Sequence, residues 1–542
     1  MVKIKNPILP GFNADPSLIR VDGTYYIATS TFEWFPGVRI HESKDLKHWK
    51  LVKNVLDTTA LLDMKGNLSS GGIWAPDLSY ADSRFWLVYT DVKITEGAFK
   101  DMTNYLTTAP GIHGPWSAPI KLNGVGFDAS LFHDDDGRKY LVQQTWDHRE
   151  YHHQFNGITL TEFDVSTMKL KPETARTIYR GTHVKLVEGP HIYKINGCYY
   201  LFTAEGGTVW AHQETVSRSR TLDADSFETM PGNPLISNVN TADSVLQKQG
   251  HGSLVSTPGG EWYYASLTGR PLNHQNECSH DPRGWSPLGR ETALQKVYWD
   301  EEQWPRIVGG QGGLLEIDGP LEYADYSPQE GHSQHDEFTE NTLDINWNTL
   351  RVPFGSEMGT VGNGLLTLTG KGSLANEHEL SLVARRWQAF RFDAETRVKF
   401  NPKSYQAMAG LTNYYNSRHW SFIFVTYDEK KKTRVIEVAE NNRGRYTSYL
   451  KDDAIPVPDD LEYVYLRTQV RDLDYTYQYS FNGKDWKDTG VNLDSAVLSD
   501  EYVLSSYGGF FTGAFVGLAA VDYSGYDTTA EFDYFDYKEG VQ

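Results

Sequence analysis

The sequence predicts an all-β protein in which a five-bladed β-propeller precedes a C-terminal β-sandwich. A phrase of two strands joined by a short turn recurs five times before about residue 310. Longer alternating strands with frequent turns follow it, and few long helical patterns occur anywhere. Repeated hairpins indicate a propeller, and alternating strands without helices are typical of a sandwich.

The first copy of the phrase shows its parts. It reads Asp15-Pro-Ser-Leu-Ile-Arg-Val, then Asp22-Gly23, then Thr-Tyr-Tyr-Ile-Ala-Thr. Asp-Gly, Asn-Gly and Gly-Gly pairs are typical of a tight β-hairpin, because its central residues take φ > 0. The later copies open at Asp77, Asp128, Glu188 and His251, and they turn at Asp82-Ser83, Asp136-Gly137, Asn196-Gly197 and Gly259-Gly260.

The spacing of these openings predicts where they lie. Successive openings are 62, 51, 60 and 63 residues apart. A period of this length built from hairpins indicates propeller blades, which are four-stranded sheets set around a channel. Because the innermost strand of each blade lines the axis, the four carboxylates and the histidine should converge there. Outer strands are predicted at 38–43, 104–109, 158–164, 217–221 and 294–300.

The domain organisation follows from where the phrase stops. We predict a propeller over residues 1–315, a linker over 316–335 and a sandwich over 336–542, because a Gly-rich passage (308–313) leads into a polar stretch (327–336). Sandwich strands are predicted at 365–369, 380–384, 394–400, 420–427, 464–470 and 475–481, with no helix. A loop at 507–513 carries the adjacent aromatics Phe510 and Phe511.

Composition limits the function. The 542 residues carry a net charge of −20, so nucleic acid and membrane surfaces are not expected as partners. Aromatic residues make up 13% of the chain, which suits stacking on sugar rings. The two cysteines, Cys198 and Cys278, are too few for a disulfide framework, and Cys198 is expected to be a buried free thiol. No stretch resembles a signal peptide or a membrane span, which predicts a cytoplasmic protein.

Carboxylates that share one pocket are suited to glycoside hydrolysis. This reaction needs a protonated carboxyl beside the leaving oxygen and an ionised one on the other face of the ring. A third carboxylate nearby keeps the acid protonated. The alternative is that repeated acidic residues hold turns or a structural cation in a non-enzyme. Periodicity alone does not tell which three of Asp15, Asp77, Asp128 and Glu188 act.

Four motifs carry a family resemblance. They are Asn13-Ala-Asp15-Pro-Ser, Trp74-Ala-Pro-Asp77, Phe127-Asp128-Ala-Ser and Val187-Glu188-Gly-Pro-His. In order and at blade spacing they resemble the blade motifs of family 43 glycoside hydrolases. The whole chain is similar to the bacterial intracellular β-xylosidases of that family, which implies a five-bladed propeller with a concanavalin-like sandwich behind it.

The resemblance implies roles for the carboxylates. Asp15 would be the general base, Glu188 the general acid, and Asp128 the residue that raises the pKa of Glu188 and orients it. The family inverts, so the base and acid carboxyls should stand ~6.5–9.5 Å apart to leave room for water. Asp77 would be a structural carboxylate of its blade.

The resemblance also implies a substrate pocket. Arg290 would bind sugar hydroxyls, with a salt bridge between blades as the alternative. Phe32, Trp74, Phe127 and Trp146 would wall the pocket, and His251 would lie beneath the substrate, each with a role in the core as the alternative. Phe511 or its neighbour Phe510 would close the propeller mouth. No metal or cofactor is required, although a divalent cation (Ca, Mg or Mn) near His251 is left open.

The implied activity is that of an inverting exo-β-1,4-xylosidase. It would release xylose from the non-reducing ends of xylobiose and short xylo-oligosaccharides. The alternatives are an α-L-arabinofuranosidase, or a bifunctional enzyme, on the same site, and a non-catalytic carbohydrate-binding propeller. Relatives assemble as dimers or tetramers, so a homo-oligomer is expected.

Overall fold

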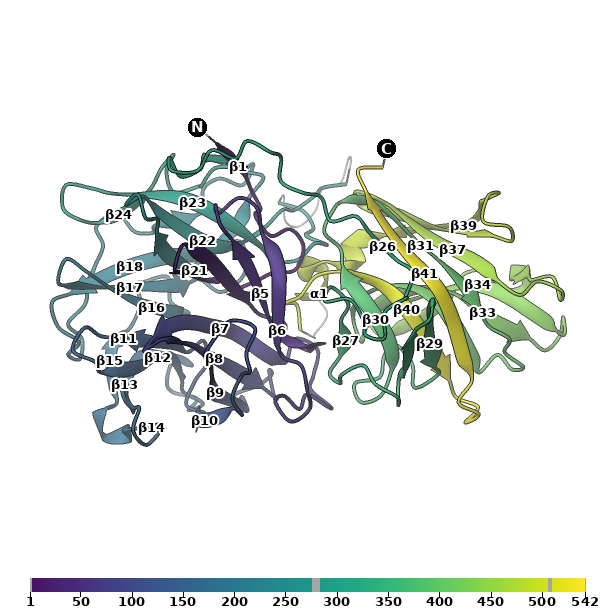
Figure 1. The fold of residues 1–542 in the computed structure, drawn as a ribbon, viewed down its shortest axis with the longest axis horizontal. Helices are drawn as coiled ribbons and strands as arrows, with labels where there is room; N and C mark the ends of the chain where they lie inside the picture. Colours follow the sequence, from purple (N-terminus) through teal and green to yellow (C-terminus); the bar gives the residue numbers. More distant parts are fainter. Residues whose placement is uncertain (1, 275–282, 505–508, 542) are drawn as a thin grey trace.

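The computed structural model describes residues 2–274, 283–504 and 509–541. Cys278 and the first two residues of the loop at 507–513 lie outside these ranges. Two bodies lie side by side: an N-terminal propeller and a C-terminal sandwich (Figure 1). Both parts of the predicted fold class are confirmed. None of the described helices is long and apolar enough to cross a membrane.

The propeller has five blades, each an antiparallel sheet. Blade 1 contains β2 (Ser17–Val21), β3 (Thr24–Thr29), β5 (Gly37–Ser43) and β6 (Lys50–Leu56). Blade 2 contains β7 (Gly72–Ala81), β8 (Arg84–Val92), β9 (Met102–Ala109) and β10 (Ile120–Asn123). Blade 3 contains β11 (Ser130–His133), β12 (Lys139–Trp146), β13 (Phe155–Asp164), β14 (Lys169–Leu170) and β15 (Arg176–Tyr179).

The last two blades follow the same order. Blade 4 contains β16 (Glu188–Ile195), β17 (Cys198–Glu205), β18 (Gln213–Ser219), β19 (Glu228–Thr229) and β20 (Ile236–Ser237). Blade 5 contains β21 (Gln247–Ser256), β22 (Trp262–Gly269), β23 (Glu291–Trp299) and β24 (Pro305–Ile307). The first strand of every blade begins at or near the opening of one copy of the repeated phrase. Cys198 is buried and free, as predicted.

Backbone irregularities mark the openings of the phrase. Asp15, Asp128 and His251 have φ of 55°, 52° and 47°, a region that non-glycine residues rarely adopt. The strand register shifts between Glu188 and His191 in β16, and again around His251 in β21. Bulges of this kind re-aim side chains. At these positions the chain therefore leaves regular strand geometry where its side chains meet near the axis.

The sandwich consists of two antiparallel sheets packed on a continuous apolar core. One sheet contains β26 (Gln334–Asp336), β28 (Gly359–Gly362), β29 (Leu365–Thr369), β31 (Arg391–Lys399), β37 (Val464–Arg471), β38 (Asp474–Ser480), β39 (Lys487–Asp494) and β41 (Thr529–Glu539). The other contains β30 (Ser381–Arg386), β32 (Ala407–Asn416), β33 (His419–Asp428), β34 (Thr433–Asn442), β35 (Arg445–Ser448), β36 (Ile455–Pro456) and β40 (Phe515–Asp522).

One short helix corrects the expectation that the sandwich has none. The helix α1 spans Asp500–Leu504 and follows a 3₁₀ turn at Ser495–Leu498. Ser499 begins it, because its Oγ accepts a hydrogen bond from the amide of Tyr502 at 3.3 Å. Five residues make little more than one helical turn, which is too short for a periodic pattern to reveal.

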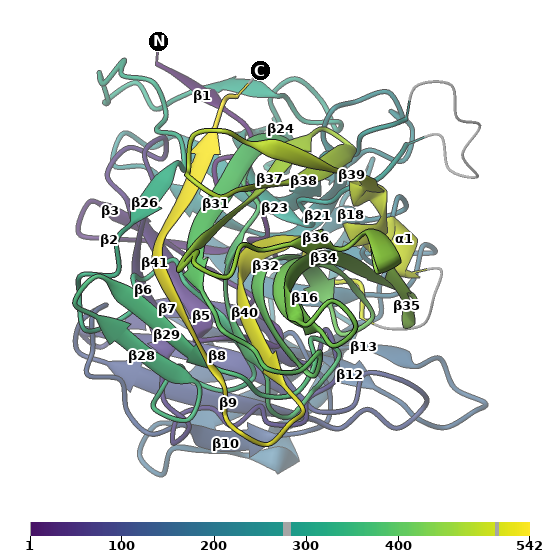
Figure 2. The ribbon, with the colours of Figure 1, turned by 90° about the vertical axis from the view of Figure 1, so that its right-hand side faces the viewer.

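Strand pairing and aromatic contacts join the two bodies. β4 (Trp34–Phe35) of the propeller pairs with β27 (Thr349–Leu350) of the sandwich, while β1 (Lys3–Lys5) pairs with β25 (Glu316–Asp318) on the propeller side. Trp34 also stacks on Phe515 of β40, with ring centroids 3.6 Å apart. Seen from the sandwich side, the sandwich strands lie in front of one end of the propeller (Figure 2).

Candidate active site

A cavity of about 280 Å³ lies between the propeller and the sandwich. Nine of the ten predicted site residues line it: Asp15, Phe32, Trp74, Phe127, Asp128, Glu188, His251, Arg290 and Phe511. They come from all five blades and from the loop before β40. Residues separated by hundreds of positions therefore meet in one small space, as the repeat predicts.

Asp15 is held as an ionised carboxylate. Its side chain is 5% exposed, and its Oδ2 accepts a hydrogen bond from Ser30 Oγ at 2.6 Å. Its Oδ1 pairs with Arg290 Nη1 at 2.9 Å and lies 3.7 Å from His251 Nδ1. Burial alone would raise the pKa of Asp15, but Arg290, His251 and the Ser30 hydrogen bond together hold it below its ordinary value.

Glu188 and Asp128 show the opposite behaviour. Burial, reinforced by the negative charge of Asp15, raises the pKa of Glu188 to about 8. Burial and the charges of Glu188 and Asp15 raise the pKa of Asp128 well above its ordinary value. Two carboxyls that repel each other in one apolar space do not both ionise easily. The pair therefore retains a proton at neutral pH while Asp15 is ionised.

Arg290 connects the carboxylate of Asp15 to the sandwich. Its guanidinium is buried, and Nε and Nη2 donate to the carbonyl oxygen of Phe511 at 3.3 and 3.0 Å. Nη1 donates to Asp15 and, at 3.4 Å, to Thr208 Oγ1. The same group lies over the rings of Phe32 and Phe511, 5.2 and 5.3 Å from their centroids.

Three of the four predicted aromatic walls line the cavity. Trp74 contacts Phe127 and Phe511 edge-on, with both centroid distances at 5.4 Å, and Phe32 adjoins Trp74 at 6.0 Å. Trp146 lies behind this layer, 6.2 Å from Phe127, where its Nε1 donates to Ala98 O at 2.8 Å. Phe155, at the start of the neighbouring strand β13, occupies the wall instead.

Six further residues line the cavity but belong to none of the motifs in the sequence. These are Phe155, Leu186, Gly206, Gly207, Thr208 and Val209. The last four belong to the connection between β17 and β18, which the repeat does not include. Their one signal is that both glycines, with φ of 85° and 68°, mark a sharp bend directly after an inner hairpin.

The loop before β40 closes the cavity with Phe511. The ring of Phe511 packs on Phe32 at 5.7 Å, and its amide donates to Ser70 Oγ at 3.1 Å. Phe510 also reaches the cavity but packs against the sandwich core. Of the two predicted candidates, Phe511 is therefore the one that contacts the propeller walls and Arg290.

A buried ion cluster anchors the sandwich behind this loop. Lys248 of β21 pairs with Glu501 of α1 at 2.5 Å and lies 3.7 Å from Asp500. Glu501 also accepts hydrogen bonds from the amide and hydroxyl of Ser286 at 2.8 and 2.9 Å. Because breaking a buried pair leaves an uncompensated charge, this contact resists separation of the two bodies.

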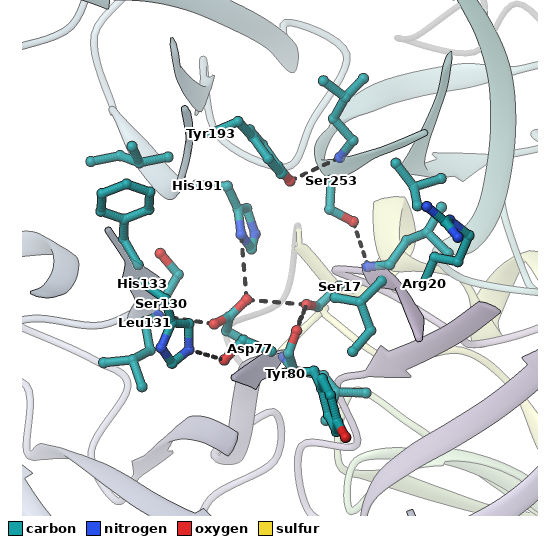
Figure 3. A pocket seen from close by; sticks show the side chains of 18 of the residues that line it. Ser17, Arg20, Asp77, Tyr80, Ser130, Leu131, His133, His191, Tyr193 and Ser253 are labelled. Atoms are coloured by element: carbon teal, nitrogen blue, oxygen red, sulfur yellow. Dashed lines mark hydrogen bonds and ion pairs between the residues drawn. The ribbon is translucent and has the colours of Figure 1, made fainter. Parts of the chain in front are cut away.

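Asp77 lies in a different cavity, as a structural role requires. This second cavity of about 430 Å³ is lined by inner strands of all five blades and, among the described residues, by none of the sandwich (Figure 3). Asp77 accepts hydrogen bonds from Ser17 Oγ at 3.1 Å and from the amide of Leu131 at 2.9 Å. It also lies 3.5 Å from His191 Nδ1, so one carboxylate ties together four blades.

One group of side chains has the spacing of a metal site. Within the described ranges, Asp45, His48 and Asp325 are the group whose ligand atoms all lie within 4.8 Å of one another. They are partly buried or exposed and do not line the cavity that holds Asp15. His251 is not part of this group.

Comparisons with known proteins identify the family. A model described as Glycosyl hydrolases family 43 matches residues 4–305, and one described as Beta xylosidase C-terminal Concanavalin A-like domain matches residues 335–538. The chain belongs to glycoside hydrolase family 43. It is therefore a glycosidase, and the resemblance carried by the four blade motifs is confirmed.

Relatives cover nearly the whole length of this family 43 chain. It is 48% identical over 542 residues to the Beta-xylosidase of Bacillus subtilis (strain 168), spanning 99% of this chain and 100% of that protein. It is 42% identical over 542 residues to Xylosidase/arabinosidase 43B of Humicola insolens, spanning 99% and 98%. The crystal structure of xylan beta-1,4-xylosidase from Bacillus halodurans C-125 matches with a TM-score of 0.93 and 46% identity, over 99% and 100% of the two chains.

The Arg290–Asp15 pair predicts a pH effect. Replacing Arg290 with Met removes the main charge that lowers the pKa of Asp15, and burial then raises it. A group with a raised pKa stays protonated to higher pH, so the acidic limb of kcat/KM for a chromogenic glycoside should move upward by roughly 1–3 pH units. Arg84→Met, an exposed arginine in β8, is the control. An unchanged acidic limb in Arg290→Met would contradict this assignment.

Proposed function

We propose that this protein is an inverting exo-β-1,4-xylosidase that acts on xylobiose and short xylo-oligosaccharides. The observation that carries this proposal is a small cavity, closed on one side by Phe511, in which Asp15 and Glu188 have pKa values shifted in opposite directions. Opposite shifts assign acid and base roles. The beta-xylosidases among its relatives support the choice of sugar.

The proposed reaction is a single displacement. Asp15, ionised at neutral pH, takes a proton from water as the water oxygen attacks the anomeric carbon. Glu188, protonated below about pH 8, gives its proton to the glycosidic oxygen as that bond breaks. Asp15 then loses its proton to solvent and Glu188 regains one, which restores both carboxyls.

Asp128 and Arg290 act on these two groups. The charge of Glu188 raises the pKa of Asp128, and burial raises the pKa of both carboxyls, so the pair keeps a proton available for the leaving oxygen. Arg290 holds Asp15 ionised, and its remaining N–H groups lie at the cavity wall, where sugar hydroxyls are natural acceptors.

Exo action follows from the closure of one side of the cavity. Phe511 and the carbonyl it presents to Arg290 close one side of the cavity. A volume of about 280 Å³ is at the small end of ligand sites, which favours a terminal sugar over an internal segment of a chain. The α-L-arabinofuranosidase, or a bifunctional enzyme, is the second candidate, because one relative is a Xylosidase/arabinosidase.

Further properties are proposed on the same basis. General acid–base hydrolysis by carboxyl groups needs no cofactor, so we propose a cofactor-independent enzyme. A cation near His251, cytoplasmic location and a homo-oligomer remain predictions.

The stereochemistry of the first product tests the single displacement. Proton NMR of xylobiose hydrolysis should show α-xylose before mutarotation, because water attacks the face opposite the leaving group. Early β-xylose would mean retention through a covalent intermediate and would overturn the base role of Asp15. No xylose from xylobiose, with hydrolysis of an α-L-arabinofuranoside, would favour the second candidate.

The acid role of Glu188 predicts a dependence on the leaving group. Glu188→Gln should lower kcat for xylobiose by ~10²–10⁴-fold, because an alkoxide is a poor leaving group without a proton. A dinitrophenyl xyloside leaves without protonation, so its kcat should fall far less. Calorimetry should show that the variant still binds xylobiose. Equal losses for both substrates would assign the acid to another residue.

The closing role of Phe511 predicts a change in products. Phe511→Ala should lower kcat/KM for xylobiose by roughly 2–10-fold through lost aromatic contacts, and xylobiose should appear early from xylotetraose. Tyr523→Ala, an exposed sandwich residue, is the control. Xylose as the sole early product of Phe511→Ala would show that another residue enforces exo action.

A further inference from the structure

A cluster of basic side chains is buried where blade 1 meets the sandwich. Arg39 and His41 project from the same face of β5, and Arg385 and Arg386 end β30. His332 precedes β26. Arg39, Arg385 and Arg386 are 3%, 3% and 2% exposed. This interface, called here the basic cluster, lies apart from the residues that line the two cavities described above.

Arg39 has no acceptor for its buried N–H groups. Its Nε and Nη1 are buried and have no hydrogen-bond partner among the described residues. Neither does Nδ1 of His41, two residues along the same strand face. Arg290, which is buried in the active site, faces a carboxylate instead: its Nη1 pairs with Asp15 at 2.9 Å.

Arg386 is satisfied only in part, and by neutral groups. Its Nε donates to Phe12 O at 2.7 Å and its Nη1 to Asn348 Oδ1 at 2.6 Å, while Nη2 is buried without a partner. Its guanidinium lies 5.1 Å from the ring centroids of both Phe12 and Phe515. Arg386 therefore bonds to groups on both sides of the domain interface, and its Nη2 has no acceptor among the described residues.

Arg385 is likewise bonded to neutral acceptors. Its Nη groups donate to Gln334 Oε1, His332 O and Gln388 Oε1 at 2.8 to 2.9 Å, and its Nε is buried without a partner. Among the described residues, none of the three guanidiniums has a carboxylate oxygen within 4.0 Å. Asp344, whose charge acts on Arg39 and Arg385, is exposed and bonds to Gln334 and Asn346.

The charges of the cluster act on one another. Burial, followed by the charge of Arg385, lowers the pKa of Arg39 to about 9. Burial, followed by Arg39 and Arg386, lowers the pKa of His41 well below its ordinary value. Burial and Arg39 lower the pKa of Arg386. The mutual effects mean that these groups lie close together. The carboxylates of Asp344 and Glu539 act on the cluster from beyond ion-pair distance, so no described carboxylate pairs directly with these groups, although buried charges normally require such a partner.

We propose that the basic cluster binds a small inorganic anion, of the chloride or phosphate class, through Arg39, His41 and Arg386. The anion accepts the N–H groups that no protein acceptor reaches, as anions do at arginine-rich sites. Its effect is structural. Arg386 holds the carbonyl of Phe12, three residues before Asp15, so the anion fixes the N-terminal segment against the sandwich.

Thermal unfolding in controlled anions tests this proposal. The protein is dialysed into a buffer whose anion is the bulky MES, and the unfolding midpoint is measured against added chloride, bromide or phosphate at constant ionic strength. A ligand that binds only the folded state raises the midpoint in a saturable way. We expect a rise of several °C. Saturation by halides alone assigns chloride as the ligand, and saturation by phosphate alone assigns an oxyanion.

Variants connect the response to the cluster. Arg39→Met keeps the length and apolar stem of the side chain but removes the N–H donors, and it should abolish the rise. Arg84→Met, exposed in β8, should retain it. An equal midpoint rise in the wild-type protein, Arg39→Met and Arg84→Met would overturn the proposal, because the salt effect would then be general.

Diffraction provides a test that needs no variant to fold. Crystals of the wild-type protein equilibrated in bromide should show an anomalous peak within hydrogen-bond distance of Arg39 Nε or Nη1. A peak elsewhere, or no peak, together with a flat midpoint in all three anions, would overturn the proposal. Binding at crystal concentration only, with no midpoint change, would also overturn it.

Discussion

The rest of the site depends on the contacts that the guanidinium of Arg290 makes. It pairs with Asp15 at 2.9 Å and donates to the carbonyl of Phe511 at 3.0 Å. The first contact sets the charge of the base, and the second joins the propeller to the loop of the sandwich that closes the cavity. Arg290 can make both because a guanidinium has five N–H donors in a planar fork.

Burial raises the pKa of both Glu188 and Asp15, but their neighbours give these two carboxyls opposite net shifts. Burial and the charge of Asp15 raise the pKa of Glu188 to about 8, because Arg290 and Lys100 offset only part of the cost of ionisation. At Asp15 the same cost is outweighed by Arg290, His251 and Ser30. One low-dielectric cavity therefore contains both an ionised and a protonated carboxyl. Exclusion of water by Phe511 strengthens both effects, since charges interact more strongly where water is absent.

Much of the site could be predicted because the propeller repeats. The spacing of Asp15, Asp128, Glu188 and His251 brings them together regardless of their surroundings, and the hairpin turns fix each inner strand. Trp146 could not be placed in the same way, because its layer depends on whether Phe155 of the next strand lies in front of it. Thr208 lies in a connection outside the repeat, and Arg39 sits in a strand whose pattern reveals burial but no missing partner.

The closed cavity is a property of both bodies and not of the propeller alone. Phe511 donates to Ser70, accepts from Arg290 and packs on Phe32, so its loop is bonded to blade 5 and to the connection between blades 1 and 2. Lys248 and Glu501 hold α1 against the propeller a few residues earlier in the chain. Without these contacts water would reach Glu188 and lower the cost of ionising it. The sandwich therefore helps to keep the pKa of Glu188 raised, although Phe511 lies more than 300 positions away in the chain. Strand pairing, stacked rings and buried charges hold the two domains in the arrangement that this effect needs.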